Sequence, residues 1–382
     1  MSLAELTAEV SPASVNPIRG KFEATRRELA AGLIERDQEI DMVLTALIAR
    51  EHCLFVGPPG TGKSMLSDSV VGWLDGTKFS VLINKFTTPE EIFGPISLQG
   101  LKIDHYRRIT TGKLPEADVA FIDEIFKASS AILNTTLQVL NERKFVNDDT
   151  VVKCPLKLCV AASNEWPGEG ETGKELGALF DRFLFRKSVR PIGSDRGIDR
   201  LLWSPCEVKL STRLSQAELA QAQAEAKMLG WSEEAKETVG QILREAKAEG
   251  IMPGDRRLKK SIGAVQAFAW LNGEAEVTSE SLEVLSHILW DDPAEQPKKM
   301  AQIVGAKANP SGMKVNELTS EASQIISTVN MADMAKVALT VKKLVGIVKE
   351  LDRVKGAKAD QARAYVSGEL RRIKLATIDG LN

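Results

Sequence analysis

Cysteine and histidine are scarce in this sequence, which has 4 cysteines and 3 histidines among its 382 residues. The cysteines show no C-x-x-C spacing, which is typical of zinc and redox sites, and Cys53 and Cys159 lie in apolar, strand-like runs. We therefore expect buried thiols in a protein of the reducing cytoplasm. The histidines are scattered along the chain, which argues against a histidine-based metal site.

Long apolar runs and an excess of one charge are also missing. No run is long enough to cross a bilayer, and residues 1–19 lack the charged-then-apolar pattern of a secretory signal. Lys and Arg number 50 against 52 Asp and Glu, so the total charge neither supports nor excludes a nucleic-acid partner. The length and the 43% hydrophobic content predict two or three domains with sizeable cores.

One short stretch organises the chain. Residues 53–56 form an apolar run of the length of a buried strand, and a helical pattern begins at Met65. Between them, residues 57–64 match G-x-x-x-x-G-K-[ST] at every fixed position. Glycines let a phosphate chain approach the backbone, and the N–H groups at the start of the helix favour its negative charge. The expected nucleotide contacts are Gly57, Pro58, Pro59, Gly60, Thr61, Gly62, Lys63 and Ser64.

A second strand-like run, residues 119–122, ends in two carboxylates, Asp123 and Glu124. In P-loop ATPases the first such acid lies near Mg²⁺ and the second near the attacking water. Asp123 would therefore hold the metal together with Ser64. Glu124 would act as the general base, and Lys63 would contact the β- and γ-phosphates. A run that ends in Asp-Glu is common, but here it follows a complete phosphate loop in an alternating α/β pattern.

Polar residues further along the chain have two interpretations each. Asn164 ends another apolar run and either senses the γ-phosphate or caps the next turn. Arg182 forms a surface ion pair or acts as an arginine finger on the nucleotide of a neighbouring subunit. Arg256 and Arg257 lie in the first turn of an expected helix, where the helix dipole disfavours cations. We favour a phosphate over surface salt bridges as their partner.

Composition divides the chain into four parts and a linker. Residues 1–31 are a polar tail followed by a helix, and residues 32–192 alternate between strand and helix patterns. Residues 210–292 are alanine-rich and helical. The helices expected there are 216–229, 233–249, 255–271 and 279–290. Residues 291–311 have the composition of a linker, and residues 312–382 that of a helical hairpin.

Three segments lie outside the nucleotide pattern. Residues 101–114 are expected to form a small hairpin or an extended insertion, and residues 144–153 a hairpin that turns at Asp148 and Asp149. The C-terminal hairpin has a heptad seam and would pack on itself or on a neighbour. The seam consists of Met334, Val337, Val341, Leu344, Val348 and Leu351.

Taken in order, these motifs resemble the MoxR branch of AAA+ ATPases. The segments most similar to its RavA-like subgroup are residues 87–98 (TTPEEIFGPISL), 121–145 (FIDEIFKASSAILNTTLQVLNERKF) and 255–260 (DRRLKK). The resemblance covers about residues 32–290. It implies an α/β P-loop core, in which helices flank a parallel sheet, followed by an all-α lid. The chain departs from the RavA-like pattern after the lid, where helices stand in place of a longer extension with a β-rich module.

The resemblance implies roles for single residues. Leu33 and Ile34 would touch the adenine, and Asn164 would sense the γ-phosphate. Arg182 would be the arginine finger that acts on the neighbouring subunit. Arg256 would be the lid sensor of the γ-phosphate, with the arginine after it as a less favoured choice.

The same resemblance implies cofactors and partners. ATP and Mg²⁺ are the expected cofactors. Such ATPases form rings, usually hexamers, and both inserted segments would face the pore or one face of the ring. Many of them act with a protein that has a von Willebrand A domain, so a partner of this kind is implied here.

Three functions follow from these features. In the leading hypothesis, ATP hydrolysis between two copies moves the lid and the inserted segments against a client protein. In the second, the chain is a nucleic-acid motor or loader whose Arg107, Arg108 and Lys113 contact phosphates, although the acidic hairpin tip would repel them. In the third, the chain is a scaffold that binds ATP without turnover. The presence of a general base and an arginine finger argues against this function.

Overall fold

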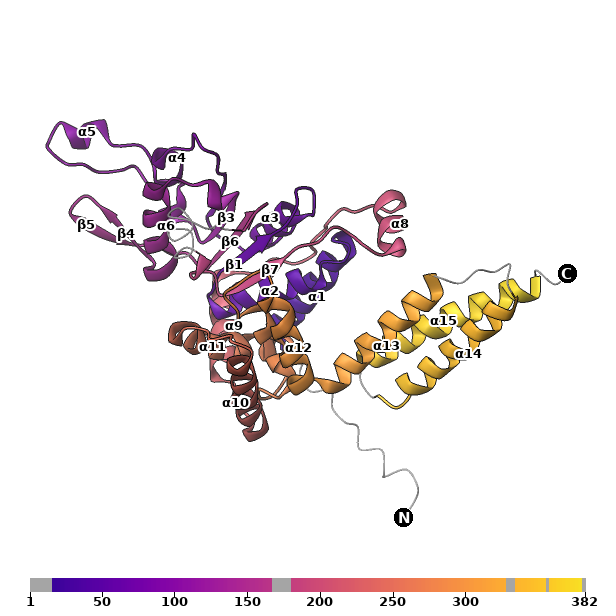
Figure 1. Cartoon of the computed structure of the whole chain (residues 1–382). Helices are drawn as coiled ribbons and strands as arrows, with labels where there is room; N and C mark the ends of the chain where they lie inside the picture. The colour runs from indigo at the N-terminus through magenta and orange to yellow at the C-terminus, as the bar shows by residue number, and fades with distance from the viewer. Residues whose placement is uncertain (1–15, 167–179, 328–333, 355–356, 380–382) are drawn as a thin grey trace, which may run out of the picture.

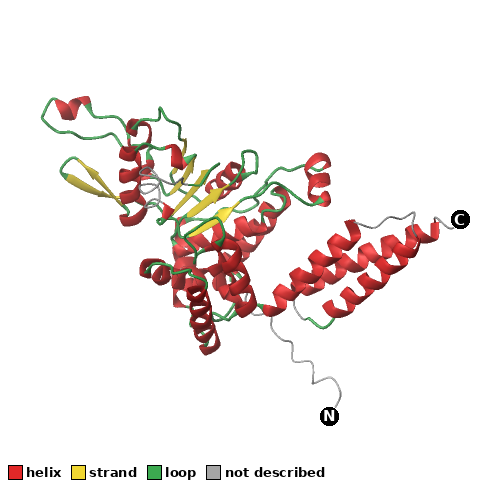
Figure 2. Ribbon diagram, in the orientation of Figure 1, coloured by secondary structure: helices red, strands yellow, loops and turns green. Residues whose placement is uncertain are grey.

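The computed structural model describes residues 16–166, 180–327, 334–354 and 357–379 (Figure 1). An α/β body carries the strands, and the rest of the chain is helical (Figure 2). The helices of the α/β body include α1 (Pro17–Gly32), α2 (Asp37–Ala49), α3 (Lys63–Trp73), α6 (Ser130–Glu142), and the short α4 (Pro89–Phe93), η1 (Leu114–Glu116) and η2 (Ile125–Lys127). None of the helices in the described part of the chain is both long and apolar enough to span a membrane.

A parallel sheet of five strands, in the order β2-β3-β6-β1-β7, forms the centre of the α/β body. The strands are β1 (Cys53–Val56), β2 (Lys78–Leu82), β3 (Val119–Asp123), β6 (Leu158–Ser163) and β7 (Phe185–Ser188). In the register, Cys53 of β1 lies opposite Val160 of β6 and Phe185 of β7. Because the strands are parallel, the loops after β1, β3 and β6 meet at one edge of the sheet, which we call the carboxyl edge. The opposite edge, where the strands begin, is the amino edge.

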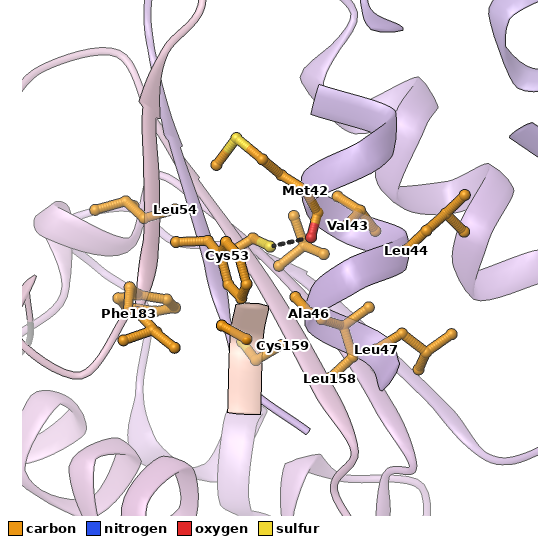
Figure 3. Packing of buried hydrophobic residues seen from close by; sticks show 14 of the residues in the cluster. Met42, Val43, Leu44, Ala46, Leu47, Cys53, Leu54, Leu158, Cys159 and Phe183 are labelled. Carbon is orange, nitrogen blue, oxygen red and sulfur yellow. Dashed lines mark hydrogen bonds between the residues drawn. The ribbon is translucent and has the colours of Figure 1, made fainter. Parts of the chain in front are cut away.

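The core of the sheet is apolar throughout, as expected for parallel strands that helices cover. Helix α2 packs on β1 and β6 with side chains that include Met42 and Ala46 (Figure 3). The thiol of Cys53 lies 3.6 Å from the carbonyl oxygen of Met42. Cys159 is equally buried, and burial raises the pKa of its thiol to about 12. The expectation of buried thiols is confirmed for these two cysteines.

Two insertions extend from the same end of the α/β body (Figure 1). The first, residues 94–113, follows α4 (Pro89–Phe93) and is extended apart from α5 (Leu98–Leu101). The second is the predicted hairpin of β4 (Lys144–Asn147) and β5 (Thr150–Lys153). Asn147 joins them: its Oδ1 accepts the N–H of Arg108 at 2.7 Å, and its Nδ2 donates to the carbonyl of Arg108 at 3.0 Å. The two insertions therefore form one surface.

The helical lid differs from its prediction in two places. Helices α9 (Gln216–Met228), α10 (Glu233–Ala248) and α11 (Asp255–Leu271) lie where the sequence predicts them, but residues 280–287 form a 3₁₀ helix, η3 (Glu280–His287). The expected linker contains α12 (Gln296–Ala308), which packs on α10 and η3. Met300, Ile303 and Val304 have helical spacing and are buried in that contact.

Two further elements were missing from the sequence prediction. Helix α8 (Asp195–Trp203) lies between β7 and the lid. At the C-terminal end, the expected hairpin is a bundle of three helices, because α13 (Pro310–Ser327) packs against α14 (Met334–Leu351) and α15 (Ala357–Asp379). The heptad seam lies in the core of that bundle, where Val337, Leu344 and Leu351 are buried. Its first position, Met334, has a side chain outside the described part of the structure.

His52 lies just before β1, and its ring connects strand β6 with helix α6. It is 1% exposed, its Nδ1 accepts the N–H of Cys159 at 2.9 Å, and its Nε2 lies 3.1 Å from the carbonyl oxygen of Leu140. A neutral ring with its proton on Nε2 satisfies both contacts. Burial lowers the pKa of His52 well below its ordinary value, and Arg143 lowers it further.

We therefore expect acid to destabilise the protein through His52. The unfolded chain takes up a proton at this histidine near pH ~6.5 and the folded chain does not, so the unfolding free energy should fall below that pH, by up to about 1.4 kcal/mol per pH unit. Chemical denaturation at pH 8 and pH 5.5 measures this loss. The loss should be smaller in His52→Gln, whereas His105→Gln, at an exposed site, should keep it. Equal losses in all three proteins would contradict this assignment.

Candidate nucleotide-binding site

The loop between β1 and α3 has a conformation that only its glycines permit. Gly60 and Gly62 have φ angles of +79° and +81°, and a Cβ atom on Gly57 would lie 2.1 Å from the carbonyl oxygen of Val189. Helix α3 begins at Lys63, and within the described structure no side chain caps its amino end. The free backbone N–H groups and the helix dipole suit a bound phosphate chain.

Lys63 is folded back over this loop. Its Nζ lies 2.7 Å from the carbonyl oxygen of Gly57, 2.9 Å from that of Pro58 and 3.5 Å from Oδ1 of Asn164. Burial lowers the pKa of the Lys63 ammonium, while the two carboxylates after β3 oppose this shift. A phosphate would replace the carbonyl contacts with stronger, charge-assisted hydrogen bonds.

Glu124 and Asn164 face each other at the carboxyl edge. Nδ2 of Asn164 donates to Oε1 of Glu124, and the backbone N–H of Asn164 lies 3.4 Å from Oε2. Glu124 has a φ of +55°, which is uncommon outside glycine and typical of functional sites. The structure thus brings together Lys63, Asp123, Glu124 and Asn164.

The oxygen ligands expected for Mg²⁺ lie beside this group. Asp123 follows the buried part of β3, Ser64 is exposed on the first turn of α3, and both types of oxygen suit a hard cation. Sequence analysis missed Asp68, which lies one turn after Ser64. Burial raises the pKa of Asp68, and the charge of Asp123 raises it further. Two carboxylates that repel each other in this way fit a bound cation, so the residues present suit Mg²⁺.

The two residues expected to contact adenine lie before α2. Leu33 and Ile34 are buried, and Cδ2 of Leu33 lies 3.9 Å from the position of a Cβ atom on Gly62. The following Arg36, which sequence analysis also missed, is buried and donates to the carbonyls of Thr61 at 2.9 Å and Arg190 at 2.8 Å. It therefore holds the phosphate loop against the segment after β7. A buried arginine among backbone carbonyls gives no signal that can be read from sequence.

Arg182 and Arg256 lie elsewhere, at the amino edge of the sheet. Arg182 precedes β7 and contacts Asp181 at 3.1 Å. Arg256, at the start of α11, donates to the side chain of Asn141 near the end of α6. Lys260 on the same helix binds Glu51, just before β1, at 2.5 Å. The structure therefore does not bring Arg256 to the phosphate loop of its own chain.

Arg257 has a different role from its neighbour. It is 3% exposed, its Nη2 lies 2.7 Å from Oδ1 of Asp181, and its Nη1 lies 3.3 Å from the carbonyl oxygen of Ile288. These contacts fasten the lid to the segment before β7. Its guanidinium is thus engaged within the chain, whereas Arg256 is exposed.

Comparison with known families agrees with this architecture. Residues 20–229, more than half of the chain, match the MoxR domain of the MoxR–vWA–β-propeller ternary systems. The chain belongs to the MoxR family of AAA+ ATPases. Residues 234–304 of this MoxR chain match an AAA lid domain, which ends within α12. The match assigns α12 to the lid, in agreement with its packing.

Several proteins resemble this MoxR chain. Two uncharacterized proteins of Methanocaldococcus jannaschii are 41% identical to it over 283 and 285 residues, which cover 74% and 73% of this chain and 74% and 72% of the relatives. A structural protein of Acidianus two-tailed virus is 32% identical over 183 residues, 47% of this chain and 29% of that protein. A crystal structure from Cytophaga hutchinsonii has a TM-score of 0.61 at 14% identity, covering 77% of this chain and 96% of the other, and shows a shared fold.

Proposed function

We propose that this MoxR chain hydrolyses ATP in a ring of identical copies and uses the cycle to remodel or assemble a protein complex. The observation that carries this proposal is the position of the arginines. Lys63 and Glu124 lie at the carboxyl edge of the sheet, and Arg182 and Arg256 at the amino edge. The length of β1, about 13 Å for four residues, separates the two edges. A second copy is therefore needed to bring Arg182 or Arg256 to the γ-phosphate.

In this mechanism the residues of the carboxyl edge act on the ATP of their own chain. Lys63 leaves the loop carbonyls and binds the β- and γ-phosphates. Glu124, released from Asn164, takes a proton from the water that attacks the γ-phosphorus, and the bond to the β-phosphate oxygen breaks. Mg²⁺, held by Ser64 and Asp123, would neutralise charge on the phosphates.

The residues of the amino edge act on the ATP of the next copy. Arg182 stabilises the charge of the transferring group, and Arg256 binds the γ-phosphate from the lid. Because both come from the neighbour, loss of the γ-phosphate changes the angle between two copies. A ring, usually a hexamer in this family, would pass that change to the two insertions.

The surface of the insertions favours a protein client over a nucleic acid. Its exposed large apolar side chains are Leu98, Leu101, Ile103, Tyr106, Ile109, Val146, Val151 and Val152. Arg108, a candidate phosphate contact, is instead bound to Glu90 at 3.1 Å and to the carbonyl of Gly94 at 2.8 Å. Asp148 and Asp149 add negative charge at the tip of the hairpin. Apolar side chains of this kind mark protein contacts.

The proposal also includes a partner protein and a cellular compartment. The domain that matches this chain is named for ternary systems with a vWA protein and a β-propeller protein. We propose a von Willebrand A-domain partner on that ground, with the client unnamed. The four free cysteines suit the reducing cytoplasm. The RavA-like resemblance remains a hypothesis about the subgroup.

The test is a phosphate-release assay on the purified chain with ATP and Mg²⁺. We expect turnover per chain to rise steeply with protein concentration, because each site needs two copies, and to level off when sedimentation shows complete rings. Full turnover by a protein that stays monomeric at saturating ATP would contradict the shared site. Nucleotide binding by complete rings without turnover would instead support the scaffold function.

A further inference from the structure

Helix α8 is fastened to the nucleotide-binding edge of the chain. The carboxylate of Glu35 accepts the backbone N–H groups of Gly193 at 2.9 Å and Ser194 at 3.1 Å, just before the helix. Nη2 of Arg200, within the helix, donates to the carbonyl of Ala31 at 3.0 Å. Glu35 directly precedes Arg36, which holds the phosphate loop. The position of α8 is therefore fixed relative to the nucleotide.

The outer face of α8 is apolar and exposed. Ile198, Leu201 and Leu202 are spaced as one helix face and are 41%, 53% and 61% exposed. Trp203, at the end of the helix, is 82% exposed. In Figure 1 the helix lies at the periphery of the α/β body, beyond α1, and away from the lid. Adjacent large apolar side chains of this kind usually mark a contact with another molecule.

We propose that this apolar face of α8 docks on the lid of the neighbouring copy, beside α11 and next to Arg256. The proposal rests on the shared active site described above. In a ring, each copy has two different contact surfaces, and the first surface of one copy binds the second surface of the next. Helix α8 belongs to the surface that carries the phosphate loop, and α11 belongs to the surface that carries Arg256. An arrangement that brings Arg256 to the next copy's ATP also brings α11 towards the next copy's α8.

The lid surface beside Arg256 has the chemistry that α8 needs. Met252, just before α11, is 68% exposed, and Ile262 on α11 is 43% exposed. Lys259, which lies between Arg256 and Ile262 along that face, is also exposed. Exposed large apolar side chains therefore occur on both surfaces. Helix α8 carries charges of both signs, Asp195 and Asp199 with Arg196 and Arg200, so its apolar side chains carry the contact. These side chains, together with the position of α8 on the surface that the shared active site brings to the neighbouring lid, indicate a second copy of the chain as the occupant.

A cysteine cross-link between two kinds of chain tests the contact directly. One chain carries Trp203→Cys and the other Met252→Cys, and both carry Cys206→Ser and Glu124→Gln. The three remaining native cysteines are buried. With ATP and a short bis-maleimide, we expect a covalent dimer of the two chains in the mixture and none with either chain alone. The matched control replaces Met252→Cys by Leu339→Cys, at an exposed position on α14, and should give no dimer.

Assembly of a second variant gives an independent readout. Trp203→Lys should keep the melting temperature of the chain, because the side chain is exposed, yet raise the protein concentration for half-assembly about tenfold or more, since a cation there would be repelled by Arg256 and Lys259. Rings with normal turnover, but without the cross-link and with unchanged assembly of Trp203→Lys, would overturn the α8 contact and leave the shared active site intact. Failure of the parent chain to form rings at all would overturn both.

Discussion

Arg182→Ala should lower ATP turnover by about 10³-fold or more, because a trans arginine stabilises charge that develops only in the transition state. Its binding of ATP should change little, since Arg182 lies at the amino edge, away from the phosphate loop of its own chain. Phosphate release at saturating ATP measures the first effect, and the affinity for a fluorescent ATP analogue measures the second. Arg213→Ala, which removes a 71% exposed side chain that pairs with Asp75 at 3.7 Å, is the control and should turn over normally.

Mixed rings decide whether Arg182 acts between copies. Lys63→Ala removes the ammonium from the phosphate loop but keeps Arg182, and Arg182→Ala does the reverse. Each variant alone should be inactive, and a mixture should recover activity wherever an intact Lys63 faces an intact Arg182 from the next copy. A mixture no more active than the two separate proteins, in rings shown to contain both, would place Arg182 outside the neighbour's site.

Asp181 connects Arg182, the proposed arginine finger, to the lid. Asp181 binds Arg182 at 3.1 Å through Oδ2 and Arg257 at 2.7 Å through Oδ1. Arg257 and Arg186 both contact Asp291, after η3, at 3.5 and 3.2 Å. Burial lowers the pKa of Arg186 to about 9. Removing one partner from the ion pairs of the buried Arg186 and Arg257 would therefore cost free energy. Arg182 is therefore positioned, through Asp181, by Arg257 of the lid.

The part of the site that the sequence predicts is the part that local rules determine. Gly60 and Gly62 must be glycine for their backbone angles, and Thr88 and Glu91 form the capping box at the start of α4. A strand that ends in Asp123 and Glu124 reaches the carboxyl edge in any parallel arrangement. These features depend on a few neighbouring residues, so they can be read from spacing alone.

The remaining features depend on distant parts of the chain. Spacing places Arg256 in the first turn of a helix but does not say which edge of the sheet that turn meets. Helix α8 has an apolar face that is exposed in the described part of the structure, so its pattern resembles neither a buried helix nor a loop. Helix α12 contains Pro297 and Gly305, which suggest a linker, although its buried face has normal helical spacing. Tertiary packing decided each of these cases.

Glu124→Gln should bind ATP and hydrolyse it at least about 10²-fold more slowly, as loss of a general base usually does. A glutamine at 124 has the same shape and its carbonyl oxygen can still accept from Nδ2 of Asn164, so the contact seen in the structure is kept. Only the capacity to take a proton from water is lost. The experiment compares single-turnover phosphate release with ATP retained in rings after gel filtration, and Glu23→Gln, at an exposed site on α1, is the control.

The two readouts separate a base from a structural residue. A base predicts slow release together with ATP retained in rings, because Lys63 and the glycines of the loop are untouched. A structural role for Glu124 predicts loss of ATP binding, since its carboxylate lies within the group formed by Lys63 and Asn164. Release at the unmutated rate would mean that another group activates the water. Asp68 would then be the next candidate, because it lies one turn after Ser64, and partial burial and the charge of Asp123 raise the pKa of its carboxyl.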